Sequence, residues 1–451
     1  MLPINQSYKR SSLASQRGQA LIYGIFLMIG GLASIFFLFN TGQLSSEKTK
    51  LVNTADAVAY SAGVMHARAL NFNAYTNRAM MANEILVAQA VSLASWMDYI
   101  GDHAGTAVSF NCTTIYNLPF ALGLLKYTPY CMGLAYAGTG YAATAESAVD
   151  GAVTVAVVAS EAAKINMQLA QNTMFFSLFA KRGEVMQEVA DANYLNDGVV
   201  KVDSVPLTDH FYLFEGKPFM TLHTGDDRKR FRDTEVRAAN LDAFVNDRSW
   251  DDETVLGCLP FLPLRGRVDR TGNTQLLDFD EWRARDRASL HTEIFEFDFF
   301  SSGCEGKGNT TIATGDRSAK SSGGDFPYSG VPNYYELSDK AREYVPEHSD
   351  ENKRDPKLRF AIRVTRSNLE VNTSTGKSPV KPTGQFDRFQ GAEAKDIMAA
   401  VGTSEVFFER SAPRADGQTE LASVFNPYWQ VHLVPNSTVD VAAAIALQAI
   451  P

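Results

Sequence analysis

Clustered positive charge is the first thing that this chain lacks. Its 451 residues contain 42 Lys and Arg against 51 Asp and Glu, which gives a net charge of −9 at pH 7. Lys9, Arg10 and Arg17 contribute three positive charges near the start, so the remainder carries −12. Nucleic acid and anionic lipid surfaces attract clustered Lys and Arg. We therefore expect no nucleic acid among the partners of this protein.

The chain also lacks the sequence motifs of the common catalytic sites. It contains no HExxH, GxSxG, GxxxxGK[ST] or paired CxxC motif. The seven histidines are scattered, and the acidic residues at 226–227 and 251–253 do not have the spacing of a calcium loop. We therefore expect no catalytic residue, no metal, no cofactor and no enzymatic activity.

Cysteine is scarce but even in number. Four cysteines allow three disulfide pairings, and the sequence does not choose among them. Pairing nearest neighbours joins Cys112 to Cys131 and Cys258 to Cys304, and each pair closes a loop without another cysteine. We favour these two bridges because an exported protein meets an oxidising compartment. Four buried thiols are the alternative.

Charge is absent from residues 18–46, and residues 20–39 are almost wholly apolar. Twenty helical residues span about 30 Å, the thickness of the hydrocarbon core of a bilayer. Basic residues precede this segment without an acid, and basic residues are retained in the cytoplasm. We predict a single-pass anchor with a cytoplasmic N-terminus and an exported remainder. A cleaved secretory signal is the alternative, although its apolar core is normally only about 7–15 residues.

Small apolar residues recur every three or four positions after the anchor. Ala55, Val58, Ala62, Met65 and Ala69 follow the 3.5-residue spacing of a helix packed lengthwise on another helix. Within the apolar segment, Gly24 and Gly31 form small-residue faces suited to contact with a second membrane helix. These residues are the candidate helix-packing positions.

We predict an α+β protein in which the membrane helix continues into a long extracytoplasmic helix with a helical partner, followed by a β-rich globular head. Alternating or clustered β-branched and aromatic residues predict strands at 210–214, 290–299, 358–364 and 405–408. The Gly- and Ser-rich residues 301–330 are expected to form a long surface loop or a locally disordered segment. The expected divisions are a cytoplasmic segment at 1–19, a transmembrane helix at 20–39, a helical region at 40–190 and the head at 191–451.

The N-terminal pattern resembles that of a known family. An Arg17-Gly18-Gln19-Ala20 sequence leads into the apolar helix, and Asn53-Thr54-Ala55-Asp56-Ala57 follows it. This combination resembles the N-terminal module of the TadE/G-like family of Flp/Tad pilus-assembly proteins, over about residues 16–65. The resemblance implies a pilin-like or minor pilin component of the bacterial inner membrane, with its bulk periplasmic or extracellular. It also implies partners among the subunits of a pilus or secretion machine, with contact through helix packing.

One departure bears on processing. The resemblance points to cleavage after Gly18, with Gln19 as the new N-terminus, but such sites usually carry Glu five residues later. Here that position is Tyr23, and the apolar helix contains no acid. This departure argues against cleavage and against a place in the filament shaft.

Two other functions stay open. An anchored extracytoplasmic binding module would use an adhesin-like head, and an anchored hydrolase would need a site that the motifs do not reveal.

Overall fold

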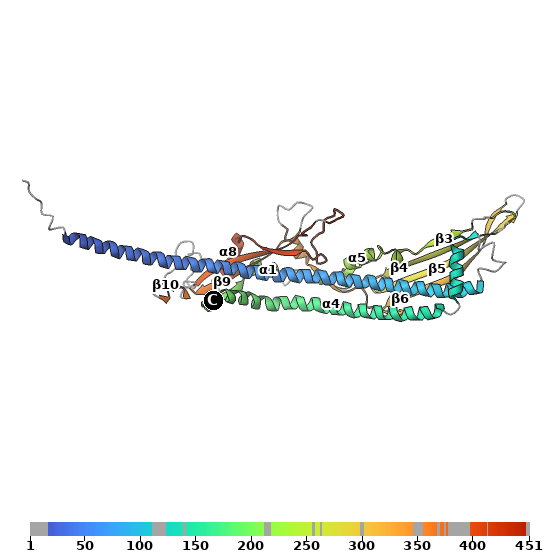
Figure 1. Ribbon diagram of the computed structural model, residues 1–451, viewed down its shortest axis with the longest axis horizontal. Coiled ribbons are helices and arrows are strands. Elements are labelled where there is room, and N and C mark those ends of the chain that lie inside the picture. The colour runs from blue at the N-terminus through green and yellow to red at the C-terminus, as the bar shows by residue number, and fades with distance from the viewer. Residues whose placement is uncertain are drawn as a thin grey trace, which may run out of the picture.

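The structure is a computed structural model, and the molecule is long and thin because every element lies along one helix (Figure 1). The described residues are 17–110, 123–138, 141–211, 218–254, 258–261, 264–297, 302–345, 355–367, 370–373, 376–377, 397–412 and 414–447.

The first helix, α1 (Arg17–Phe110), runs for 94 residues, or about 140 Å at 1.5 Å per residue. No proline occurs between Pro3 and Pro119, so nothing in the sequence interrupts its hydrogen bonds. Its apolar first part stands clear of the rest of the chain, and its second part is covered by other elements (Figure 1). The predicted continuation of the apolar helix into a long second helix is confirmed.

The second long helix, α4 (Tyr141–Asn193), lies antiparallel beside α1 after the short helix α3 (Tyr127–Ala137). Polar contacts fix the register of the two helices. Lys164 Nζ donates to Glu84 Oε1 over 2.9 Å, and Gln171 Nε2 donates to Asn77 Oδ1 over 2.7 Å. The predicted helical partner is therefore present.

A four-stranded antiparallel sheet covers the part of α1 nearest the apolar segment. Its order is β1 (Val200–Ser204), β9 (Leu358–Ser367), β12 (Ile397–Phe408) and β13 (Trp429–Leu433). One apolar core joins this sheet to both helices, and it contains Leu51, Val58, Ala62, Phe360 and Val406. Ordinary alternation fails in β9 because both of its faces are covered, so nearly all of its residues are buried.

A second sheet covers the far part of α1. Its order is β3 (Trp250–Glu253), β4 (Leu264–Leu277), β5 (Glu281–Phe297), β6 (Ser302–Lys320) and β7 (Phe326–Pro327), with only the β6–β7 pair parallel. The expectation of a loop over 301–330 is wrong, because β6 is a 19-residue strand. Pairing with the whole of β5 and burial of Ile312, Ala313 and Ala319 outweigh the weak strand propensity of its Gly and Ser residues.

Short elements complete the chain. Strand β2 (Met220–His223) pairs with β8 (Tyr334–Leu337), and β10 (Asn372–Thr373) pairs with β11 (Gly376–Lys377). The short helices are η2 (Pro206–Thr208), η3 (Gly225–Arg228), α5 (Lys229–Ala239), α6 (Ala243–Asn246), α7 (Asp339–Glu343) and α8 (Thr438–Ala446). The strand predicted at 210–214 is not formed at His210 and Phe211, and its other residues lie outside the described part.

The β-rich region is laid along the helices, whereas the sequence led us to expect a head that follows them. Residues on both sides of the expected boundary at 190 share the same cores, as Ala55 and Ile362 do. Glycines let the strands approach α1 closely. A Cβ on Gly402 of β12 would lie 2.5 Å from the Ala55 carbonyl oxygen, and one on Gly315 of β6 would lie 2.1 Å from that of Ser95.

This close approach predicts a stability effect at Gly402. Gly402→Val forces β12 away from α1, and overpacking of this kind costs about 1–3 kcal/mol. Circular dichroism of the full-length protein in detergent should show a melting temperature lowered by several degrees. Gly306→Val in β6 is the matched control, because a Cβ there meets nothing within 4 Å. Equal melting temperatures for the two variants would contradict the close-packing explanation.

Candidate membrane anchor and the packed helix beyond it

The apolar part of α1 makes no packing contact that buries its side chains. All fourteen large hydrophobic side chains from Leu21 to Phe39 are exposed by 47% or more. A stable protein in water does not leave so long an apolar surface uncovered. Among the described residues, this helix alone combines the length and apolarity needed to cross a membrane.

The candidate positions at the start of this segment also lack neighbours. A Cβ built on Gly24 or Gly31 would meet nothing within 4 Å. Both glycines are therefore free to receive a helix from another molecule within the bilayer. Gly18 and Gln19 lie in the first turn of α1, and processing there stays a sequence hypothesis.

An ion-pair network marks the point where α1 enters the folded part. Arg366 of β9, which is almost fully buried, contacts Glu47 over 2.6 Å and Asp197 over 3.2 Å. Lys50 also pairs with Asp197, and Lys48 donates to the Ala399 carbonyl oxygen. Burial lowers the pKa of Lys48. The sequence showed these residues of α1 only as a flank of mixed charge, because their partners lie about 150 to 350 positions away.

The seam residues lie inside the core of their own chain. Ala55, Val58, Ala62 and Ala69 are fully buried, and Met65 packs partly buried against the same core. Their neighbours include strands of the first sheet, so the small side chains serve a helix-to-sheet contact as well as a helix pair. The folded chain therefore leaves these five residues little surface for another subunit.

A buried charged cluster joins α1 and α4 farther along. Lys164 donates to Glu84 and, over 2.7 Å, to the Gly330 carbonyl oxygen, while Tyr328 donates to Glu84 over 2.6 Å. Glu235 of α5 is also buried here, and both of its carboxyl oxygens lack a hydrogen-bond partner. Burial raises the pKa of Glu84, and burial together with the Glu84 charge raises that of Glu235 well above its ordinary value.

Two further buried clusters hold the fold beside α1. Arg182 of α4 contacts Asp209 over 2.6 Å, and its other nitrogen lies 3.3 Å from His66 Nε2. Asp286 of β5 accepts from Arg248 and Arg270, each over 2.8 to 2.9 Å. Each charge is paired, as burial of an ion requires. None of these residues was identified from the sequence, since their spacing shows no motif.

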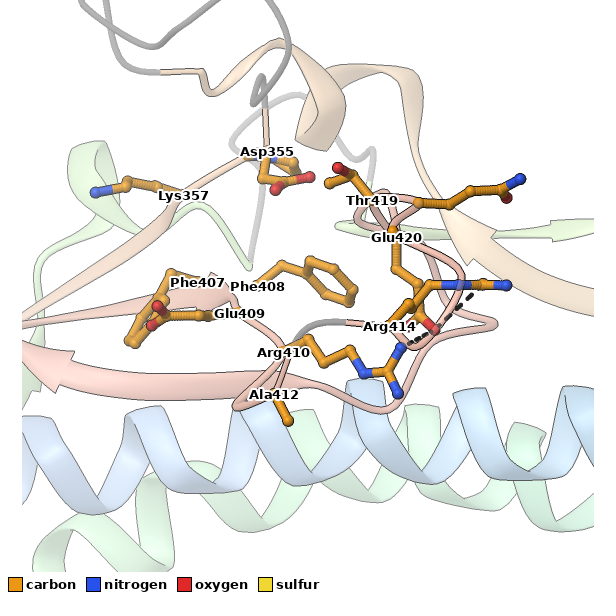
Figure 2. A pocket seen from close by; sticks show the side chains of 13 residues that line it. Asp355, Lys357, Phe407, Phe408, Glu409, Arg410, Ala412, Arg414, Thr419 and Glu420 are labelled. Atoms are coloured by element: carbon orange, nitrogen blue, oxygen red, sulfur yellow. Dashed lines mark hydrogen bonds and ion pairs between the residues drawn. The ribbon is translucent and has the colours of Figure 1, made fainter.

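A cavity of about 540 Å³ lies beside β12 (Figure 2). Phe407 and Phe408 supply its apolar wall, and charged side chains supply the rest. Arg410 contacts Glu420 over 2.9 Å, and Arg414 contacts Asp416 over 2.6 Å, so these charges are already paired. The described lining contains no arrangement of nucleophile and base.

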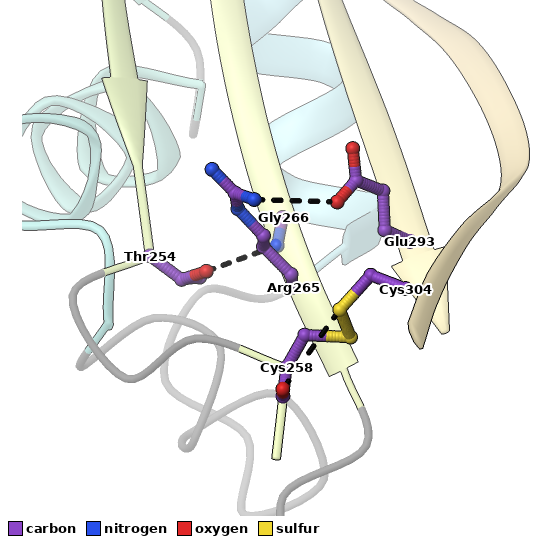
Figure 3. Close-up of a disulfide and its surroundings, with 6 residues drawn as sticks. All are labelled: Thr254, Cys258, Arg265, Gly266, Glu293 and Cys304. Atoms are coloured by element: carbon purple, nitrogen blue, oxygen red, sulfur yellow. Dashed lines mark hydrogen bonds and ion pairs between the residues drawn. A yellow bond between two sulfur atoms is a disulfide. The ribbon is translucent and has the colours of Figure 1, made fainter. Parts of the chain in front are cut away.

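The structure joins Cys258 to Cys304, with their Cα atoms 6.0 Å apart (Figure 3). The bridge ties the start of β6 to the connection between β3 and β4. Cys131 in α3 is also disulfide-bonded, whereas Cys112 lies outside the described residues. Over the described part of the chain, no three His, Cys, Asp or Glu residues gather as a metal site would require.

The buried acid Glu235 predicts a pH-dependent stability difference. Its folded pKa is raised, so above the unfolded value of about 4.3 the folded state holds a proton that the unfolded state has lost. Stability is therefore lost as the pH rises, and Glu235→Gln removes this loss. The melting temperature of the variant minus that of the natural protein should increase from pH 5 to pH 8. Glu184→Gln, at an exposed position of α4, is the control, and a gap that does not change with pH would contradict the assignment.

The disulfides predict a measurable linkage. The Cys258–Cys304 bridge spans 46 positions, and closing such a loop restricts the unfolded chain by on the order of 4 kcal/mol. Mass spectrometry of non-reduced digests should show linked peptides for Cys258–Cys304 and for Cys112–Cys131. Four thiols that alkylate freely in protein from its native compartment would contradict the prediction.

The comparisons with known proteins bear on the N-terminal region. Comparison with curated proteins and with solved structures finds no match. Residues 18–69 match the family described as putative Flp pilus-assembly TadE/G-like. The match extends from the start of the exposed apolar helix to Ala69 in the packed part of α1. The N-terminal region of this chain therefore carries the TadE/G-like module of Flp pilus-assembly proteins, as its sequence pattern predicted.

Proposed function

We propose that this protein is a membrane-anchored, pilin-like or minor pilin component that acts structurally in the assembly of a Tad/Flp-type pilus. The family match to residues 18–69 supports a pilus-related role. The observation that carries the finer proposal is the division of α1 into two parts. Its apolar beginning is bare, while its continuation is built into the cores of the folded region.

This division supports a mechanical role for the helix. One unbroken helix transmits position from the bilayer to both sheets, because no proline or loop separates the two parts. About 65 residues of α1 lie beyond the apolar segment and would reach roughly 100 Å from the membrane surface. A rigid spacer of this kind presents the far sheet at a fixed distance from the bilayer.

The flanking charges support the orientation. Lys9, Arg10 and Arg17 precede the apolar segment, and retention of basic residues places them in the cytoplasm. The bulk of the chain then lies in the periplasm or outside the cell, where disulfides form. We place the anchor in the bacterial inner membrane.

A second candidate function is an anchored binding module, and one surface favours it. Leu259, Phe261 and Phe297 are exposed beside the Cys258–Cys304 bridge, at the end of the molecule opposite the anchor (Figure 1). Exposed aromatic side chains at a fixed tip are typical of contact surfaces.

The orientation is tested with reporter fusions. A reporter active only outside the cytoplasm should be active when fused after residue 100, because the positive flank holds the N-terminus inside. A reporter active only in the cytoplasm serves as the reciprocal control. Activity of that second reporter at residue 100 would overturn the proposed topology.

An anchor exchange separates the two functions. Replacing residues 20–39 with an unrelated membrane helix of equal length keeps the anchor and removes the faces of Gly24 and Gly31. If the protein is an assembly component, surface pili should be lost although the protein still reaches the membrane. Normal pili with the exchanged anchor, together with loss of cell adhesion in Phe297→Ser, would favour the binding module.

A further inference from the structure

The outer face of α4 is an uncovered apolar strip. Val155, Ile165, Leu169 and Phe176 are 69%, 58%, 62% and 68% exposed. Together with the exposed residues Val158, Ala162 and Thr173, they recur every three or four positions, which places them along one side of a straight helix. The opposite side of α4 carries the buried residues Val157, Lys164, Gln171 and Leu178.

This strip carries no exposed charge. Between Gly151 and Ala180 the only ionisable side chains are those of Glu161 and Lys164, and these are 13% and 2% exposed. Charged side chains return at both ends, with Asp150 before the strip and Lys181 after it. A solvated helix face normally carries charges, so a neutral apolar face of 30 residues indicates a protein contact.

The charge of the chain selects the occupant. With a net charge of −9, two copies repel each other wherever their acidic surfaces meet. A neutral strip is a place where a copy can meet the same residues of another copy without opposing like charges. Discrimination between different partners normally uses charged pairs, and this face offers none.

We propose that the outer face of α4, from Val155 to Phe176, packs against the same face of a second copy of this chain, with the two helices parallel. The parallel direction rests on the proposed membrane anchorage, because both copies then rise from one bilayer. The contact between the two faces does not depend on a role in pilus assembly.

The size of the strip explains why the membrane matters. Val155 to Phe176 covers about 32 Å of helix, and at a width of about 10 Å the strip offers on the order of 300 Å². A stable complex in solution normally buries about 800 Å² per partner. Tethering in one bilayer raises the effective concentration of the second copy and compensates for the small area. The dimer should therefore form in membranes and weaken in dilute detergent.

Cysteine cross-linking of the full-length protein in membranes tests the contact. Ile165→Cys should give a covalent dimer with a short bis-maleimide, because the native cysteines are expected to be paired. The control is Leu241→Cys, which is 89% exposed in the turn after α5. Adding Ile165→Glu to Val158→Cys should reduce the dimer at least about tenfold, since each copy then opposes a like charge. An Ile165→Cys yield no higher than that of the Leu241→Cys control would overturn the proposal.

Two further measurements fix direction and partner. In a parallel pair, Val155→Cys and Phe176→Cys each cross-link to themselves, whereas cross-links only between the two variants would indicate antiparallel packing and contradict the proposal. A photo-reactive residue at position 165 that captures a different protein in native cells would show that another partner covers the strip. Expression without other pilus components separates the two proposals, because the dimer should persist there even if the assembly role is wrong.

Discussion

The burial of one helix against two sheets is the contact on which the rest of this structure depends. From Leu51 onward, α1 contributes side chains to the three largest apolar cores, and the sheets on either half of it contact each other little. Because α1 is the shared member, neither sheet is a head that could fold without it. Removing the packed half of α1 would expose one face of every major core at once.

The same constraint explains where the small residues lie. A sheet can approach a helix closely only where side chains are small on both sides of the contact. On α1 these are Ala55, Ala62 and Ala69, and on the strands they are Gly402 and Gly315. Buried ion pairs then fix the register along the helix, at Arg366 with Glu47 and at Lys164 with Glu84. The apolar contact supplies most of the driving force, and the paired charges select one alignment.

The division of labour along α1 connects the fold to the proposed role. The bare apolar turns are suited to the bilayer, the covered turns hold the sheets, and α4 presents an apolar strip to a neighbour. An assembly protein needs these three surfaces to be kept apart, so that contact with one partner does not disturb the fold. Here a continuous helix separates the anchor from the folded region without a hinge in the described residues.

The sequence by itself determined the parts of this protein that depend on local order. The anchor, the long helices and the family resemblance follow from an apolar run, a helical period and a short motif, all carried by neighbouring residues. Strands β5, β9 and β12 were predicted in part, because β-branched and aromatic residues cluster there. Only the tertiary structure decided that residues 302–320 form a strand, that the seam faces a sheet, and that Glu84, Lys164 and Glu235 meet. The physical reason is that these features depend on partners about 70 to 350 positions away, and local propensity does not encode which distant surface will bury a given side chain.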